Sequence, residues 1–472
     1  MSKKIFGGLL IAGILLTGCT LKNTTDVSIL ATSDLHGVLH SELNDYVKNE
    51  KNKDKNTTLV DAGDFYDREF GVSQDMLKFM EQTYEDYENN VKTYRECPLP
   101  KEMKDIGYDA VVLGNHEFVS NYKDSLDDLI SDFKKQNIDV LSANTYKNNG
   151  QSYTKPYVVK ELDTKNGKIK LGILGLTIKE VGEKKSWDGE KLVDNKSLEL
   201  KDQSGYKDKL YMNDLVEDAK KWVKVMKEKE KTDVIIAVAH SGEKPKKPKN
   251  PGNRIQDLAT QVSGIDAIVA GHNHVQIKQH DYKNKDGEKV IVTEPGKHGE
   301  CISKINLKLK KEKDKWKVVD KSSDIVQFEK SKKYLEKLSN NIIEFDMSVY
   351  ENKNKIGKEI KLKSIIPFKY DKIYVFKPNT PREKIYKTIG YKFLNISESD
   401  KHQLIFMNGD EAILYLGGVD PCFPISFEFN KSYFKDDVLI IKPNENDLFK
   451  MQKDKPNPYT NSETFKFVYK SK

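Results

Sequence analysis

The chain has 472 residues, of which 32% are charged, and a net charge of +7. Its mean hydropathy of −0.69 excludes an integral membrane protein, while 19 Phe and 23 Tyr supply enough apolar surface to exclude a disordered chain. The net charge is small beside 80 basic and 73 acidic side chains, so we expect no binding to nucleic-acid polymers. The four cysteines are too few and too scattered for a disulfide scaffold.

The N-terminus has the features of an export and attachment signal. Two lysines precede an apolar run over residues 5–16, which has signal-peptide length and is too short to span a bilayer. The run ends in Leu-Thr-Gly-Cys19, which resembles the lipobox at which bacterial lipoproteins are cleaved and acylated. We expect residues 1–18 to be a signal peptide, Cys19 to carry lipid, and residues 19–26 to tether the protein to the extracellular face of the cell membrane. The alternative is an ordinary secretory signal in which the cysteine occurs by chance.

Between residues 27 and 330, short β-branched runs alternate with charged amphipathic stretches. This alternation predicts an α/β domain with largely buried strands. A core-facing helix is expected over Met76–Val91, where apolar residues recur at helical spacing. The expected strands are Val27–Thr32, Thr57–Asp61, Asp109–Leu113, Ile138–Ser142, Ile169–Leu176, Asp233–Ala239 and Ile265–Ala270.

The last third of the chain has a different pattern. Further strands are expected over residues 302–309, 316–320 and 324–328. We place a linker over residues 331–360, in which only the first few residues have a helical pattern. Residues 361–472 are expected to form a separate, smaller α+β domain of undefined role.

Metal-binding side chains follow five of the expected strands directly. The groups are Asp34-Leu-His36, Gly63-Asp64, Gly114-Asn115-His116-Glu117, His240 and Gly271-His272-Asn273-His274. Because ligands of α/β proteins bind outside the carboxyl ends of strands, these groups should converge. Carboxylate and amide oxygens with imidazoles suit divalent ions such as Mn²⁺, Fe²⁺ or Zn²⁺, so the sequence predicts a dinuclear metal centre. The other histidines are expected at the surface or in loops and receive no role: His40, His280, His298 and His402.

The order of these groups resembles that of the calcineurin-like metallophosphatases. The sequences that flank these groups, such as Ala31-Thr-Ser-Asp-Leu-His-Gly37 and Gly114-Asn-His-Glu-Phe118, are similar to those of the secreted 5′-nucleotidase and 2′,3′-cyclic-nucleotide phosphodiesterase branch. The resemblance covers roughly residues 27–328. It implies an αββα sandwich within the α/β class, followed by the smaller α+β domain, and metal-dependent hydrolysis of phosphoric esters.

The resemblance also implies a role for each site residue. The first metal ion would take Asp34, His36, Asp64 and His274, and the second would take Asp64, Asn115, His240 and His272. Two such ions, whether Mn, Zn or Fe, would activate water and clamp the phosphoryl oxygens. Catalysis is assigned to Asn115 and His116, the latter stabilising the transition state or protonating the leaving ribose oxygen. A purely structural role for His116 is the alternative. Glu117 is expected to support the site, and Asn144 either lines it or satisfies buried backbone groups.

Three features depart from the family. Nucleotidases usually carry an Asp three residues after the catalytic histidine, where it orients the imidazole, but this chain has Val119. Either another group orients His116, or its pKa and position differ. The loop Phe65-Tyr66-Asp67-Arg68-Glu69 also replaces the usual Gly-Ser/Thr-Pro turn. The C-terminal region does not align with the base-stacking domain of the branch.

We therefore expect a nucleotide-hydrolysing, lipid-anchored phosphoesterase. The similarity of residues 233–274 to the cyclic phosphodiesterases favours the 2′,3′-cyclic diester over a 5′-monoester. A nucleotide sugar or another phosphodiester is an alternative substrate, and a non-catalytic surface binding protein is the alternative from another class. The oligomeric state is left open.

Overall fold

The structure is a computed structural model that describes residues 24–67, 72–89, 91–187, 192–244, 252–390, 401–417, 424–456 and 463–470. The expected signal peptide and the acylated Cys19 lie outside these ranges. No helix in the described part of the chain is long and apolar enough to cross a membrane.

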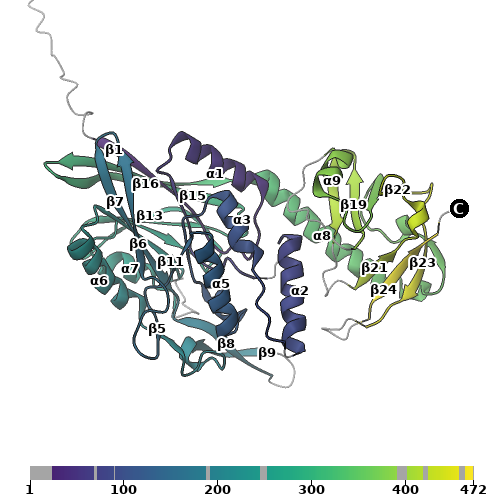
Figure 1. Cartoon of the computed structure of the whole chain (residues 1–472), viewed down its shortest axis with the longest axis horizontal. Coiled ribbons are helices and arrows are strands. Elements are labelled where there is room, and N and C mark those ends of the chain that lie inside the picture. The colour runs from purple at the N-terminus through teal and green to yellow at the C-terminus, as the bar shows by residue number, and fades with distance from the viewer. Residues whose placement is uncertain are drawn as a thin grey trace, which may run out of the picture.

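Two six-stranded sheets form the larger part of the molecule (Figure 1). The first runs β16 (Lys315–Gln327), β15 (Cys301–Glu312), β1 (Thr24–Thr32), β2 (Thr58–Asp61), β3 (Ala110–Val112) and β4 (Asp139–Leu141). The second runs β13 (Gln276–Lys283), β14 (Lys289–Pro295), β12 (Ala267–Ala270), β11 (Val234–His240), β7 (Gly167–Thr177) and β6 (Tyr157–Thr164). Strands β1 to β4 pair in parallel, as do β7, β11, β12 and β14. All seven strands expected before residue 271 are confirmed.

The sheets pack face to face, and helices cover both outer faces. Alternation along β1 shows the layers: Ile29 packs into the core between the sheets, while Leu30 packs into the core beneath the helices of the first sheet. That outer face is covered by α1 (Ser41–Lys53), α2 (Gln74–Glu88), α3 (Pro98–Ile106) and α5 (Lys123–Lys135). The second sheet is covered by α6 (Leu215–Val225) and α7 (Ile255–Gln261). The expected αββα sandwich is confirmed.

Two local expectations need correction. Helix α2 buries Met76 as expected but ends before Val91, which is 48% exposed. The strands expected over residues 316–320 and 324–328 form one continuous strand, β16, which ends at Gln327. This strand lies at the edge of its sheet, where the polar residues between the two apolar runs can face solvent and still pair with β15.

The remaining elements of the sandwich are short. They are α4 (Asn115–Val119), the pair β5 (Thr145–Lys147) and β10 (Leu210–Met212), and the pair β8 (Glu180–Trp187) and β9 (Leu192–Glu199).

The C-terminal module begins with helix α8 (Glu329–Glu351), where we expected a linker. Tyr334 and Leu338 of this helix pack into one core of the module, and Phe345 and Val349 pack into the other. Charged residues dilute this apolar stripe, which is why the sequence pattern indicates only the first turns of the helix.

Two four-stranded sheets complete the module, with helix α9 (Arg382–Ile389). One contains β17 (Glu359–Lys361), β23 (Leu448–Lys453), β24 (Phe465–Tyr469) and β21 (Ile425–Glu428). The other contains β20 (Glu411–Leu416), β19 (Gln403–Asn408), β18 (Lys372–Phe376) and β22 (Val438–Ile441). The module is of the expected α+β type.

Candidate metal centre

Loops after five parallel strands bring all seven expected ligands together. Asp34 and His36 follow β1, Asp64 follows β2, Asn115 begins α4 after β3, His240 ends β11, and His272 and His274 follow β12. The convergence arises because these strands end at the same side of the two packed sheets.

The backbone of these loops is held in an uncommon conformation. Five of the seven residues have φ between +47° and +78°: Asp34, His36, Asp64, His272 and His274. Such values cost a residue with a side chain about 1 kcal/mol or more, so surrounding contacts must maintain them. The backbone amides of Asp34 and His36 donate to the carbonyls of Gly63 and Asp64 at 2.9 and 2.8 Å, which joins the loops after β1 and β2.

One glycine allows the close approach of two of these loops. A methyl group on Gly114 would collide with the Asp64 carboxylate and would lie 2.5 Å from its backbone nitrogen. Glycine at this position therefore lets the loop after β3 lie directly against Asp64.

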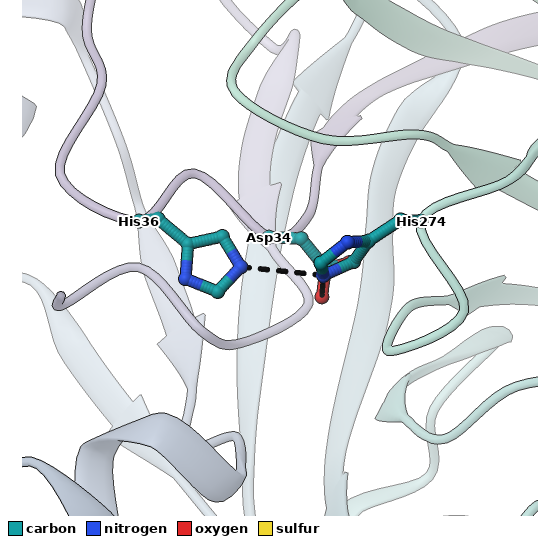
Figure 2. A group of neighbouring side chains, drawn as sticks. All are labelled: Asp34, His36 and His274. Carbon is teal, nitrogen blue, oxygen red and sulfur yellow. Dashed lines mark hydrogen bonds and ion pairs between the residues drawn. The ribbon is translucent and has the colours of Figure 1, made fainter. Parts of the chain in front are cut away.

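The first donor group contains Asp34, His36 and His274 (Figure 2). The Nε2 atoms of His36 and His274 lie 3.3 Å apart, and Nε2 of His274 lies 3.3 Å from Oδ1 of Asp34. Asp34 and His36 are buried, whereas the side chain of His274 is 37% exposed. The backbone amide of His272 donates to the Asp34 carboxylate at 3.1 Å, which links this group to the next.

The second donor group contains Asp64, Asn115, His240 and His272. Oδ1 of Asn115 lies 3.0 Å from Nε2 of His240 and 2.8 Å from Nδ1 of His272. Oδ2 of Asp64 lies 3.1 Å from the same Nε2 of His240, and its Oδ1 accepts the backbone amide of His116 at 2.7 Å. Asp64 thus takes part in the second group, while its backbone carbonyl accepts the amide of His36, a member of the first group, at 2.8 Å.

The donor set fits a bound cation. Nδ1 of His240 lies 2.9 Å from the carbonyl of Ala62, which fixes it as an N–H and leaves Nε2 as the nitrogen that can hold either a second proton or a cation. That Nε2 faces two further acceptors, Asp64 Oδ2 and Asn115 Oδ1, at about 3 Å. Acceptors at such distances repel unless a proton or a cation lies among them, so these residues suit a divalent ion.

The charges at the site are strongly coupled. Burial opposes ionisation of Asp34 and Asp64, but neighbouring histidines, among them His240, hold both pKa values below the ordinary range. Burial would lower the pKa of His240, yet the Asp64 carboxylate raises it to about 10. Burial and His240 lower the pKa of His272 to about 4. Two anionic carboxylates and a neutral His272 are therefore present at neutral pH.

His116 lies beside this cluster, with its side chain 33% exposed. Its Nε2 is 3.9 Å from Oδ2 of Asp64, while its Nδ1 is 2.5 Å from Oδ2 of Asp67. Burial would lower the pKa of His116, but Asp67 and Asp64 raise it to about 9. Val119, at the position of the family's Asp, is 50% exposed.

Comparison with known proteins identifies the family. Residues 27–276, more than half of the chain, match the calcineurin-like phosphoesterase family. The chain belongs to this family. The resemblance stated from the motifs is confirmed, and this phosphoesterase belongs to a family that uses divalent metal ions.

Several curated relatives of this phosphoesterase are nucleotide hydrolases by name. The trifunctional nucleotide phosphoesterase YfkN of Bacillus subtilis (strain 168) is 31% identical to it. The match covers 63% of this chain and 20% of YfkN. This phosphoesterase is 25% identical over 64% of its length to 46% of the 2′,3′-cyclic-nucleotide 2′-phosphodiesterase/3′-nucleotidase of Yersinia enterocolitica. A 5′-nucleotidase of Vibrio vulnificus is 34% identical over 37% of this chain and 28% of its own length. The chain spans about half or less of the length of these relatives.

A solved structure agrees with the fold. The crystal structure of the calcineurin-like phosphoesterase YfkN from Bacillus subtilis superposes with a TM-score of 0.51 at 28% identity, over 64% of this phosphoesterase and 91% of that chain.

Two supporting residues of the phosphoesterase are structural. Buried Glu117 accepts the backbone amides of Asp64, Tyr66 and Gly114 at 3.0, 2.8 and 2.6 Å, so it joins the loops after β2 and β3. Asn144 exchanges hydrogen bonds with the backbone of Thr177 and donates to Asn213, which favours backbone satisfaction over a place in the site.

Sequence reasoning missed three groups around the centre. Asp67 contacts His116, as described above. His298, which we expected to have no role, donates its backbone amide to the carbonyl of Asp34 at 2.9 Å, and its ring centroid lies 5.6 Å from that of His36. Buried Glu294 accepts the backbone amide of Val275 at 3.3 Å, next to His274. Glu294 lies in β14, another parallel strand, and His298 follows that strand, so the same strand-end rule could have found His298.

His40 lies in the loop before α1, which agrees with the expectation of a surface or loop position, but its side chain is buried. Its Nδ1 accepts the amide of Leu43 at the start of α1, and its Nε2 contacts the carbonyl of Gly299.

Proposed function

We propose that this chain is an extracellular, lipid-anchored phosphoesterase that uses two divalent ions to hydrolyse nucleotides, with a preference for 2′,3′-cyclic nucleotides. The observation that carries the proposal is the pair of donor groups, joined by the amide of His272 on the Asp34 carboxylate, with the partly exposed His116 beside Asp64. A 5′-nucleotidase or a nucleotide-sugar hydrolase is the nearest alternative.

The ion-binding roles follow the two donor groups. Asp34, His36 and His274 would hold one ion, and Asn115, His240 and His272 the other, with Asp64 as the bridge. When bound, such ions supply electrophilic activation and neutralise charge on the phosphoryl group. The buried carboxylates, already ionised, keep the site anionic and ready for cations.

His116 is suited to the departing oxygen. Its Nδ1 is occupied by Asp67, so Nε2 is the nitrogen that points towards the centre. The raised pKa keeps the ring protonated at neutral pH. We expect the Nε2–H bond to break as the leaving ribose oxygen gains the proton, and water from the exposed side to restore it.

The choice of substrate rests on the relatives. Those named as cyclic-nucleotide phosphodiesterases match over 62–64% of this chain, whereas the bacterial 5′-nucleotidases match over 37%. The wider match supports cyclic diesters as the first substrate class to test.

The extracellular, lipid-anchored location rests on the N-terminal sequence. The lysines, the apolar run and the Leu-Thr-Gly-Cys19 box support it. Incorporation of labelled palmitate into the wild-type protein, and its loss in Cys19→Ala, would test the anchor. Palmitate incorporation that persists in the variant would contradict it.

The decisive assay uses the soluble form that begins after Cys19, supplied with Mn²⁺. Product release is compared for 2′,3′-cyclic AMP, 3′-AMP, 5′-AMP and bis-(p-nitrophenyl) phosphate. Asp64→Asn is the control, expected to lose activity and at least one metal ion because the bridge loses its charge. Turnover of a nucleotide by the wild type alone supports the proposal. No product release from any nucleotide, with two ions bound per chain, would contradict the proposal. Absence of metal binding would favour the non-catalytic alternative.

A further inference from the structure

We propose that Asp67 is a positioning residue that serves two histidines at once: it orients His116 for proton donation and steadies His36 for metal binding. Oδ2 of Asp67 lies 2.5 Å from Nδ1 of His116 and 3.4 Å from Nδ1 of His36. The two imidazoles stand nearly perpendicular, with ring centroids 4.7 Å apart and an interplanar angle of 86°. The part that concerns His116 rests on the proposed function.

Both histidines depend on this one carboxylate. Their Nδ1 atoms are shielded from solvent and make no hydrogen bond of regular geometry with the described residues, so their contact with the Asp67 carboxylate is an ion-pair contact. Each ring presents its opposite nitrogen to the centre: Nε2 of His36 faces His274, and Nε2 of His116 faces Asp64. An imidazole whose Nδ1 is fixed has its Nε2 fixed as well, since the ring is rigid.

The chain holds Asp67 in place through its neighbours. The amide of Gly37 donates to the carbonyl of Phe65 at 2.8 Å, and the amide of Tyr66 donates to Glu117 at 2.8 Å. The Ser120 hydroxyl lies 3.5 Å from Oδ1 of Asp67. The backbone that precedes Asp67 is therefore tied to the loop of His36 on one side and to helix α4, which carries His116, on the other.

Helix α4 offers a second position for a carboxylate that reaches His116 alone. Val119 lies three residues after His116, one turn along the helix, where side chains are neighbours. It is 50% exposed and belongs to neither donor group, so an aspartate is tolerated there. A relocated carboxylate separates the two roles, because it follows His116 on its own helix and not His36.

The kinetic experiment compares the wild type, Asp67→Asn, His116→Ala, Val119→Asp and the double variants at saturating Mn²⁺. Asp67→Asn should lower kcat for the best nucleotide about 100-fold and change KM less than about 3-fold, because proton donation fails while binding persists. With bis-(p-nitrophenyl) phosphate, whose leaving group needs no proton, Asp67→Asn should lower kcat less than about 5-fold. In the His116→Ala background the same substitution should change kcat less than about 2-fold. Adding Val119→Asp to Asp67→Asn should restore kcat at least about 10-fold.

The metal experiment measures Mn²⁺ affinity by calorimetry on the same proteins. Asp67→Asn should weaken the binding of one of the two ions about 10-fold. Loss of a carboxylate behind a ligating histidine lowers metal affinity about 10- to 100-fold. The weakening should persist in the His116→Ala background and should not be repaired by Val119→Asp. Asp266→Asn is the matched control: its carboxylate is 16% exposed, pairs with Lys321, and lies at the other end of β12. It should alter neither kcat nor affinity.

A spectroscopic readout stands apart from activity. In the Zn²⁺-loaded protein with ¹⁵N-labelled histidine, the Nδ1 proton of His116 should give a low-field signal that Asp67→Asn and His116→Ala abolish and Asp266→Asn retains. Persistence of that signal in Asp67→Asn, or an equal kcat loss in the His116→Ala background, would overturn the His116 role. Unchanged Mn²⁺ affinity would overturn the His36 role. If the wild type hydrolyses no nucleotide, the proposed function is contradicted instead. The spectrum and the Mn²⁺ affinities then still decide the role of Asp67.

Discussion

His240 combines, within one side chain, the burial, hydrogen bonding and charge that prepare the centre for a cation. Its Nδ1 contacts the Ala62 carbonyl and its Nε2 faces Asp64 and Asn115. The carboxylate raises the pKa of this buried imidazole to about 10, so without metal the ring holds a proton at neutral pH. A proton and a metal ion then compete for the same nitrogen.

We predict that Mn²⁺ binding releases this proton and strengthens as pH rises. Between pH 7.5 and 9, below the His240 pKa, the association constant of the second ion should rise about tenfold per pH unit. His272, with a pKa of about 4, and the ionised Asp34 and Asp64 have no proton to release there, and the measurement uses His116→Ala so that the proton of His116 does not contribute. Calorimetry in buffers of different ionisation enthalpy measures the released proton. A Mn²⁺ affinity independent of pH in this window would refute the prediction.

The neighbouring His116 should behave as a proton donor and not as a ligand. His116→Ala should lower kcat for nucleotides by about 10²- to 10⁴-fold, because the leaving oxygen loses its acid. Metal content, measured by elemental analysis, should stay at the wild-type value. A drop in bound metal would show that His116 is a ligand.

At the scale of the element, the loops that follow the strands set the distances between the residues of the centre. Glu117, in the first turn of α4, accepts three backbone amides from the loops after β2 and β3. The same two loops carry Asp64 and Asn115, and Gly114 lets them touch. The position of the bridging carboxylate relative to the second donor group therefore depends on this short helix.

We predict that Glu117→Gln destabilises the protein by about 1–3 kcal/mol. Glutamine keeps one acceptor oxygen, and its NH₂ group leaves at least one buried backbone amide without a partner. Urea unfolding of the metal-free protein measures the change. Glu161→Gln, at a half-exposed position paired with Lys168, is the control and should shift stability by less than about 0.5 kcal/mol. A change in stability as small as that of the control would contradict the conclusion that Glu117 joins the loops after β2 and β3.

The whole molecule consists of two parts with separate hydrophobic cores (Figure 1). Among the described residues, the clusters of the sandwich extend no further than Phe328, and those of the C-terminal module begin at Tyr334. Near the junction, the amide of Ser331 donates to Glu42 at 2.7 Å, which is a polar contact. Every expected metal ligand belongs to the sandwich.

Residues 24–330 should therefore fold and bind two metal ions without the C-terminal module. We expect the melting temperature of this fragment to lie within about 5 °C of the first transition of the full soluble chain, because its cores are intact. Calorimetry and elemental analysis test both statements. Aggregation, or loss of either ion, would show that the module completes the sandwich.

The strands and the convergence of the expected ligands were predictable because local sequence encodes them. β-branched runs specify buried strands, and the strand-end rule places Asp34, Asp64, Asn115, His240 and His272 at one side of parallel sheets without knowledge of their packing. Helix α8 was recognised only in part, since its apolar stripe is diluted by charges and its helical state depends on the module it packs against.

What the sequence determined by itself was therefore the fold class, the family and the residue types of the centre, all of which lie in short, ordered motifs. Only the tertiary structure decided the partners of those residues. The contact of Asp67 with His116 joins residues 49 positions apart, on loops after different strands, and the approach of His298 to His36 joins the two sheets. Such pairings depend on how strands order and sheets stack, which is set by burial over the whole core and not by any local pattern.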